Sequence, residues 1–166
     1  AAHNADLFQR LGGRVHVCEE TSQEAQSALF EGTDLVVDAL FGVGLNKALK
    51  GSAADLVELA KHHSTPLRVA LDVPSGICSN TGASLGEHVF EADLTLTFGL
   101  PKVGLYQGDG VLFSGVCVTL PIGWPGAAIR SVHPGWRVCD AHAVAYALAP
   151  RRPASHKGDH GHSAVL

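Results

Sequence analysis

The sequence predicts an α/β protein of Rossmann-like, three-layer α/β/α architecture, with a mainly parallel sheet and helices on both faces. Short apolar runs rich in valine and leucine are typical of strands that are buried on both faces. These runs alternate with longer segments of helical periodicity, which favours parallel strands joined by right-handed crossovers. The clearest apolar runs lie at residues 34–40, 66–73, 93–98 and 116–122.

The segment before the first apolar run is predicted to contain two helices and a short strand. The Gly-Gly pair at 12–13 supplies a C-terminal stop for the first helix, and RVHVC at 14–18 should follow as a strand. Thr21 and Glu24 form a capping-box pattern ahead of the second helix, which Gly32 should end.

Two loops and a third helix are predicted in the middle of the chain. A glycine-punctuated loop at 41–51 leads to Ser52, which can cap a helix that runs to about His63. A longer loop with glycines and serines covers 74–87.

The last third of the sequence is less regular. Residues 123–135 have the glycine and proline content of a linker. Asp140 is predicted to cap a short helix over 141–149, which Pro150 ends.

Charge and cysteine content exclude several classes of protein. The net charge is −4 with histidines neutral and no basic block occurs, so we expect no nucleic-acid partner. No apolar stretch approaches the roughly 20 residues that span a bilayer, so we expect no membrane partner. The four cysteines lie far apart without a C-x-x-C pair, which indicates free thiols and a cytoplasmic location. They are Cys18, Cys78, Cys117 and Cys139.

Three oxygen-bearing side chains are predicted to meet at one edge of the sheet. The carboxyl ends of parallel strands open on the same edge, where ligands bind. Asp38 lies near the end of one apolar run, Asp72 at the end of the next, and Ser75 in the turn that follows. Such oxygens suit a hard cation, and a carboxylate in a partly desolvated cleft suits proton transfer or stabilisation of a developing positive charge. Alternatively, Asp72 only orders the Pro-Ser-Gly turn and Asp38 only caps a loop.

The loop after the first apolar run is a candidate phosphate cradle. Gly42, Gly44 and Gly51 permit close approach of a ligand to the backbone, and Lys47 and Lys50 add positive charge before a helix N-terminus. The loop contains neither a Walker motif nor G-x-G-x-x-G, and flexible loops have a similar composition. Both interpretations stay open.

Three segments, in this order and spacing, resemble the NAD(P)H-hydrate epimerase domain, the YjeF N-terminal domain family: DLVVDALFGVGLNKALKG, VALDVPSGICSNTG and ADLTLTFGLPKVGLYQGDG. The resemblance covers residues 5–123, and the segment around DVPSG is its most specific part. The tail RRPASHKGDHGH, at 151–162, resembles the opening of the ADP-dependent NAD(P)H-hydrate dehydratase domain.

The resemblance implies a repair reaction and a role for each predicted site residue. Hydration of NADH or NADPH at C6 of the nicotinamide ring gives R and S forms, which the epimerase interconverts. Asp38 and Ser75 would be ligands of a monovalent cation, K⁺, and Asp72 would contact the substrate and assist reversible loss of the C6 hydroxyl. The implied substrate-binding loop consists of Gly42, Val43, Gly44, Leu45, Asn46, Lys47 and Ala48.

The resemblance also implies two domains. Residues 1–132 would be an epimerase domain without its N-terminal strand and Asn/Gly-rich loop. Residues 133–166 would be a linker and the truncated opening of a dehydratase domain, whose missing part would use ADP or ATP with Mg²⁺ on the S form. The sequence contains no methionine. We therefore expect an N-terminally truncated fragment that is weak or inactive alone, within an active parent protein.

Two other functions remain as alternatives. The same domain occurs in a eukaryotic mRNA-decapping scaffold, so the chain could be a non-catalytic nucleotide- or RNA-binding module; the lack of basic patches speaks against this. A generic nucleotide-binding α/β enzyme is disfavoured by the lack of G-x-G-x-x-G.

A homo-oligomer is compatible with the sequence. Lys102, within GLPKVGL, matches the family pattern but is left without a role.

Overall fold

The computed structural model describes residues 2–63, 67–132, 135–148 and 153–160. The chain forms two compact units, Ala1–Val132 and His133–Leu166. The assignment of these units to an epimerase domain and to the opening of a dehydratase domain stays a prediction.

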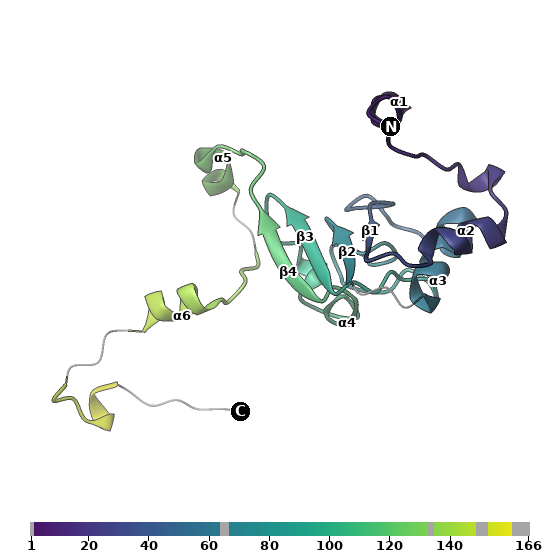
Figure 1. Ribbon diagram of the computed structural model, residues 1–166. Helices are drawn as coiled ribbons and strands as arrows, with labels where there is room; N and C mark the ends of the chain where they lie inside the picture. Colours follow the sequence, from purple (N-terminus) through teal and green to yellow (C-terminus); the bar gives the residue numbers. More distant parts are fainter. Residues whose placement is uncertain (1, 64–66, 133–134, 149–152, 161–166) are drawn as a thin grey trace. The chain divides into compact units, whose positions relative to one another are not determined.

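The first unit contains one parallel sheet with the strand order β1-β2-β3-β4 (Figure 1). The strands are β1 Leu35–Asp38, β2 Leu67–Leu71, β3 Leu94–Phe98 and β4 Val116–Leu120. Each predicted apolar run therefore contains a strand. Because consecutive strands are neighbours and parallel, each connection crosses back over the sheet. The Rossmann-like α/β class is confirmed.

Two helices lie in these connections and pack on the same face of the sheet. Helix α3 (Ser52–His62) joins β1 to β2, and the short helix α4 (Gly110–Phe113) joins β3 to β4. Ala70 of β2 belongs to the apolar cluster under α3, and Cys117 of β4 packs against the cluster that includes Phe113 of α4. The register aligns both positions with Thr95, so both clusters lie on one face.

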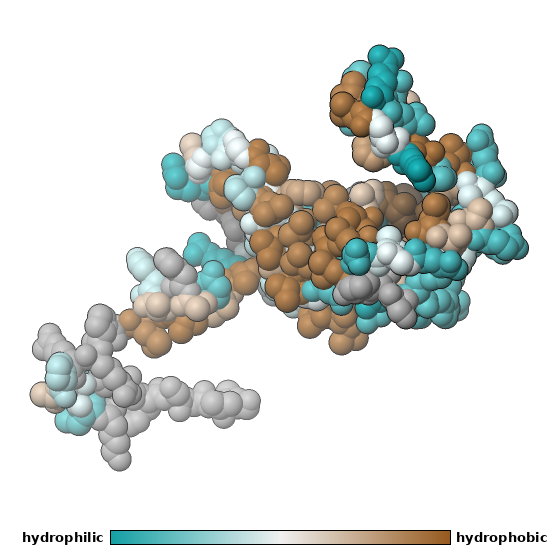
Figure 2. Space-filling view, viewed as in Figure 1, coloured by the Kyte–Doolittle hydropathy of each residue, from teal (hydrophilic) through white to brown (hydrophobic). Residues whose placement is uncertain are grey.

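The opposite face of the sheet is apolar and open to solvent. Its side chains alternate along the strands with those of the covered face. Five of them are 40–66% exposed: Leu35, Val37, Leu67, Val116 and Val118. Figure 2 shows a broad hydrophobic area over the strands. The structure thus shows one of the two expected helical layers packed on the sheet.

The predicted first helix is confirmed as α1 (Ala2–Arg10), and Gly12 has the positive φ of a C-terminal stop, 90°. The predicted strand at 14–18 is wrong. Residues 14–17 have no regular structure, and Cys18–Glu20 form the 3₁₀ helix η1. A strand persists only when its backbone groups find a partner, and among the described residues β1 at the sheet edge pairs with β2 alone.

Two predicted helix caps are wrong by one residue. Ser22, rather than Thr21, caps α2 (Gln23–Phe30), because its hydroxyl accepts from the Ala25 amide at 3.3 Å. The Thr21 hydroxyl donates instead to the Val17 carbonyl. Gly51 is the N-cap of α3, so Ser52 is the first helical residue. Thr21 is also extended, but Ser22 is the residue that directly precedes the first helical residue, as a cap does. Gly51 has a positive φ of 56°, which glycine adopts readily.

The predicted linker at 123–135 contains a further helix, α5 (Gly126–Ser131), so that prediction is partly wrong. Its Ala-Ala-Ile-Arg core has good helix propensity, which the surrounding glycines and prolines conceal. In the second unit, α6 (Ala141–Ala147) is capped by Asp140 as predicted. Its predicted end at 149–150 lies outside the described residues. The remaining elements are the 3₁₀ helices η2 (Val103–Leu105) and η3 (Lys157–His160).

Among the described residues, no helix is both long enough and apolar enough to cross a bilayer.

Candidate active site

The carboxyl ends of β1, β2 and β3 form the edge at which the site lies. Asp38 is the last residue of β1, Asp72 directly follows β2, and Phe98 is the last residue of β3. The register pairs Asp38 with Ala70, two residues before Asp72. This is the edge at which open parallel sheets bind ligands.

Asp38 and Ser75 are joined directly. The Ser75 hydroxyl donates to Oδ1 of Asp38 at 2.7 Å, and the Ser75 amide donates to Oδ2 at 2.7 Å. The Leu40 amide also donates to Oδ1, at 3.1 Å. The Ser75 hydroxyl in turn accepts from the Phe41 amide at 3.1 Å. The predicted convergence of Asp38 and Ser75 is therefore found.

Burial has the largest effect on the pKa of Asp38. The residue is 3% exposed, and this desolvation raises the pKa of the carboxyl, while the hydrogen bonds from Ser75 and Leu40 act in the opposite direction. None of the ion pairs formed by the described residues includes Asp38. A buried carboxylate surrounded only by neutral donors is a suitable ligand for a cation.

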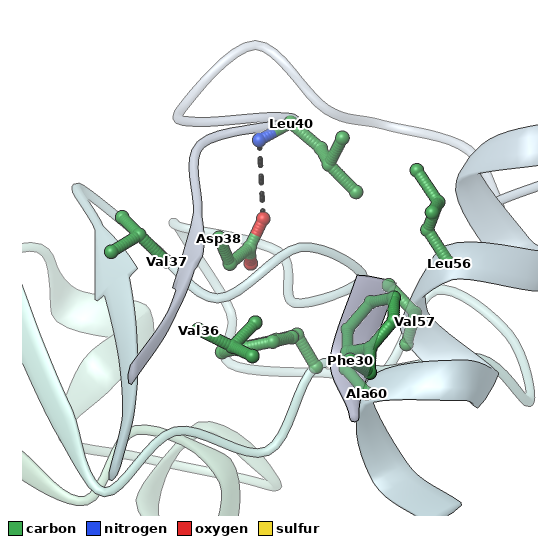
Figure 3. Close-up of a pocket in the computed structure, with 9 residues that line it drawn as sticks. Phe30, Val36, Val37, Asp38, Leu40, Leu56, Val57 and Ala60 are labelled. Atoms are coloured by element: carbon green, nitrogen blue, oxygen red, sulfur yellow. Dashed lines mark hydrogen bonds between the residues drawn. The ribbon is translucent and has the colours of Figure 1, made fainter. Parts of the chain in front are cut away.

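Asp38 lines an apolar pocket. It has a volume of about 110 Å³ and lies between β1, α2 and α3, with Asp38 as its one polar lining residue (Figure 3). Figure 3 shows the carboxylate accepting from the Leu40 amide, with hydrocarbon side chains around it. The lining residues are Phe30, Val36, Val37, Asp38, Leu40, Leu56, Val57, Ala60 and Phe90.

Asp72 has a strained backbone. Its φ is 71°, and it is the one residue other than glycine with a positive φ in the described part of the chain. Asp tolerates this region better than most residues, but the conformation still costs on the order of 1–3 kcal/mol. The Asp72 amide is fixed by a 2.8 Å bond to the Leu96 carbonyl. Strain of this kind concentrates at ligand and catalytic sites.

The two carboxylate oxygens of Asp72 have different surroundings. Oδ1 lies 2.6 Å from Nζ of Lys102, and it accepts from the Phe98 amide at 3.3 Å and weakly from the Thr97 hydroxyl at 3.5 Å. Oδ2 receives no hydrogen bond from the described residues and faces Gly42. A Cβ on Gly42 would lie 3.0 Å from Oδ2. One oxygen is therefore held, and the other is available to a ligand.

The loop after β1 connects the two acidic residues. Leu40, Phe41 and Gly42 contact Asp38, Ser75 and Asp72 in turn. Three consecutive residues thus place the predicted cation ligands and the predicted catalytic carboxylate beside one short backbone segment. The three predicted residues share one site.

The rest of the predicted substrate-binding loop is mostly open to solvent. The Val43 carbonyl accepts from the Ser79 hydroxyl at 3.3 Å, and Leu45 packs against the core. The exposed members of the loop are Val43, Gly44, Asn46, Lys47 and Ala48. Their role in binding a substrate stays a prediction.

The turn that carries Ser75 requires a glycine. Gly76 has φ 101°, and a Cβ there would lie 2.5 Å from the His88 carbonyl oxygen. The Ser75 carbonyl accepts from the Phe90 amide at 2.9 Å. The DVPSG segment is therefore fixed on both sides, and it holds the Ser75 hydroxyl in place.

Lys102 is the residue of the site to which no role was assigned from the sequence. Its Nζ donates to the Phe98 carbonyl at 2.6 Å and pairs with Asp72. The matching segment GLPKVGL singled the residue out, but its distance from Asp72 depends on the path of the chain after β3.

The parallel sheet defines a Rossmann-like α/β protein, and Asp38, Asp72 and Ser75 form a candidate site at the carboxyl edge of that sheet. A family model described as "YjeF-related protein N-terminus" matches residues 1–104. The chain belongs to this family.

Similar proteins carry related names. A bifunctional NAD(P)H-hydrate repair enzyme of Thermofilum pendens is 37% identical over 158 residues, which are 95% of this chain and 29% of that protein. The protein of the same name from Escherichia coli is 37% identical over 169 residues, 100% of this chain and 30% of its own length. An NAD(P)H-hydrate epimerase of Rhodopirellula baltica is 37% identical over 130 residues, 78% of this chain and 51% of that protein. The chain thus spans about three tenths of the bifunctional relatives.

Proposed function

We propose that residues 1–132 are an NAD(P)H-hydrate epimerase domain, which interconverts the R and S forms of hydrated NADH and NADPH. Membership of the family and the names of the similar proteins support this. The observation that carries the proposal is the arrangement of Asp72. Its backbone is strained, its Oδ1 is held by Lys102, and its Oδ2 faces Gly42 without a hydrogen bond from the described residues.

The proposed reaction is a reversible loss of water from C6 of the ring. The C6 hydroxyl takes up a proton from solvent and leaves as water. As the C6–O bond breaks, the lone pair of the ring nitrogen forms a double bond to C6, so the ring becomes positively charged. Addition of water to either face then returns the proton and gives the R or the S form. Asp72 stabilises the cationic ring, because only the charged species gains from a neighbouring carboxylate. The loop from Gly42 to Ala48 binds the substrate.

We further propose that Asp38 and Ser75 hold K⁺ next to this loop. The donor atoms are oxygens, and Asp38 is 3% exposed and has no cationic partner among the described residues. This set fits a hard cation and would supply part of its coordination shell. A bound cation would also fix the backbone of Leu40 and Phe41, which contact the same two side chains.

We propose a longer protein as the context of this domain. The similarity to bifunctional relatives extends over nearly the whole chain. Residues 133–166 would then be a linker and the opening of a dehydratase domain, which would use ADP or ATP with Mg²⁺ on the S form. The four cysteines are free thiols, which supports a cytoplasmic location.

Separated epimers test the proposed activity. We expect this chain, or the complete protein encoded by its gene, to convert pure S hydrate into an R and S mixture faster than buffer, without loss of total hydrate. Asp72→Asn keeps the shape and removes the charge, so it should slow conversion by at least about 100-fold. Chromatography of the two forms measures this. A complete protein that leaves the S form unchanged would refute the proposal, and RNA binding by it would favour the scaffold alternative.

Thermal unfolding tests the cation proposal without an activity assay. K⁺ should raise the melting temperature relative to an equal concentration of tetramethylammonium, because it binds only the folded state. The rise should be larger at pH 8 than at pH 4, since the cation binds the ionised form of Asp38. Asp38→Asn should abolish the difference between the two salts. Equal melting temperatures in both salts at pH 8 would exclude K⁺ from this site.

A further inference from the structure

We infer that Lys102 is the positioning residue of this site: its ammonium group binds Oδ1 of Asp72 and thereby presents Oδ2 to the substrate loop at Gly42. The inference rests on the proposed function for its catalytic meaning. Its structural meaning, that Lys102 determines which oxygen faces the loop, stands on the contacts alone.

Lys102 is fixed independently of Asp72. Its Nζ lies 2.6 Å from the Phe98 carbonyl, and its backbone is the N-cap of η2, whose Leu105 amide donates to the Lys102 carbonyl at 3.0 Å. The ammonium is therefore held at the end of β3 before it meets the carboxylate. One N–H group goes to Phe98, one faces Oδ1, and an ammonium group has three.

A second donor on the same oxygen completes the arrangement. The Phe98 amide donates to Oδ1 at 3.3 Å, so Phe98 contributes its carbonyl to Lys102 and its amide to Asp72. A carboxylate that accepts two donors on one oxygen cannot rotate freely to exchange its oxygens. Oδ2 stays directed at Gly42, where the absence of a Cβ leaves room for it.

A role in stability alone does not account for this pair. Lys102 and Asp72 are 17% and 20% exposed, so both charges are largely desolvated, and that loss offsets most of the Coulombic gain. The carboxylate is also attached to a backbone with φ 71°, which itself costs free energy. An ion pair on a strained residue at a ligand-binding edge is better explained by orientation of the carboxylate.

The test compares Lys102→Met with Lys61→Met. Methionine retains the apolar stem of Lys102 and removes the ammonium. Lys61 is exposed on α3, away from the site, so its replacement removes an equal charge as a control. We expect Lys102→Met to lower kcat by about 10- to 100-fold with KM changed less than about threefold, because the carboxylate is misplaced rather than lost. Lys102→Arg should restore part of kcat, and Lys61→Met should match the wild type.

A double mutant separates orientation from other effects. If Lys102 acts through Asp72, adding Lys102→Met to Asp72→Asn should lower kcat no further. Additive losses would overturn the inference, as would a kcat for Lys102→Met within twofold of the wild type. The free energy of unfolding of each variant shows whether a loss of kcat is due to misfolding. If Lys102→Met is misfolded, Lys102→Arg replaces it in the comparison with the wild type.

Amide hydrogen exchange tests the structural half without substrate. Loss of the ammonium should free the carboxylate and speed exchange of the Phe98 amide several-fold relative to Lys61→Met. Unchanged exchange at Phe98 would overturn the inference even if the wild type is active. A wild-type protein that fails to interconvert the epimers would refute the proposed function alone, and the exchange rates would then decide the role of Lys102.

Discussion

The hydroxyl of Ser75 donates to Oδ1 of Asp38 over 2.7 Å, although 37 positions separate the two residues. This contact ties the end of β1 to the turn after β2. Both residues are buried, and the same hydroxyl accepts a hydrogen bond from the Phe41 amide, so one serine holds both the Asp38 carboxylate and the loop beside it.

Ser75→Ala should therefore destabilise the protein by about 1–3 kcal/mol, because it leaves a buried carboxylate oxygen and the Phe41 amide with fewer partners. Ser114→Ala is the matched control. The Ser114 hydroxyl is buried and has no hydrogen-bond partner in the described residues, so its removal should be neutral or slightly stabilising. Urea unfolding measures both. Equal costs for the two variants would contradict this account of Ser75.

The raised pKa of Asp38 predicts how the free energy of unfolding depends on pH. The folded state binds the proton more tightly than the unfolded chain, whose carboxyl has a pKa near 3.8. As pH rises from 3.8 through the folded-state pKa, this group should lower the free energy of unfolding, and the loss should persist at higher pH. Asp38→Asn should remove this contribution to the pH dependence in potassium-free buffer. An identical pH profile for wild type and variant would disprove the assignment.

Gly42→Ala should disturb the free oxygen of Asp72. The new methyl group would lie 3.0 Å from Oδ2, so the carboxylate must move by a few tenths of an ångström. We expect kcat for epimerisation to fall by about tenfold, with little change in the free energy of unfolding. Gly44→Ala adds the same group to the same loop and meets no atom within 4 Å. Its effect on kcat should be clearly smaller, and losses of equal size would show that the contact at Gly42 is unimportant.

The strain at Asp72 can be measured by two variants that both lack the carboxylate. Asp72→Gly and Asp72→Ala differ in whether a Cβ must be accommodated at φ 71°. Glycine relieves the strain at positive φ, but its greater freedom in the unfolded chain offsets part of this gain. The glycine variant should therefore be more stable than the alanine variant by a net of roughly 0.5–1 kcal/mol. Denaturant unfolding of the pair checks this. An alanine variant of equal or greater stability would mean that the backbone relaxes out of the strained region.

The sheet could be predicted because its signals are local. Each apolar run is short and valine- or leucine-rich, and each yields a parallel strand. The residues at 14–18 carry a similar apolar alternation, yet they form no strand, since pairing depends on a neighbour that local sequence does not specify. The cap of α2 moved from Thr21 to Ser22 because two adjacent hydroxyl residues both satisfy the pattern.

The site could be predicted in part for a similar reason. Asp38 ends β1, and Ser75 lies in the turn after the neighbouring parallel strand β2, so their convergence follows from topology. The contact of Lys102 with Asp72 does not, because it depends on the turn after β3 and on the strained conformation of Asp72. Periodicity and propensity predict neither feature.

The open apolar face of the sheet has a consequence for handling this protein. The side chains of Val116 and Leu35 are exposed to water on a face that helices ordinarily cover in parallel sheets. Each square ångström left uncovered forgoes about 25 cal/mol of burial free energy. The fluorescence of dyes that bind exposed hydrophobic surface should therefore increase with the native protein. Low concentrations of detergent or chaotrope should prevent its aggregation before they unfold it.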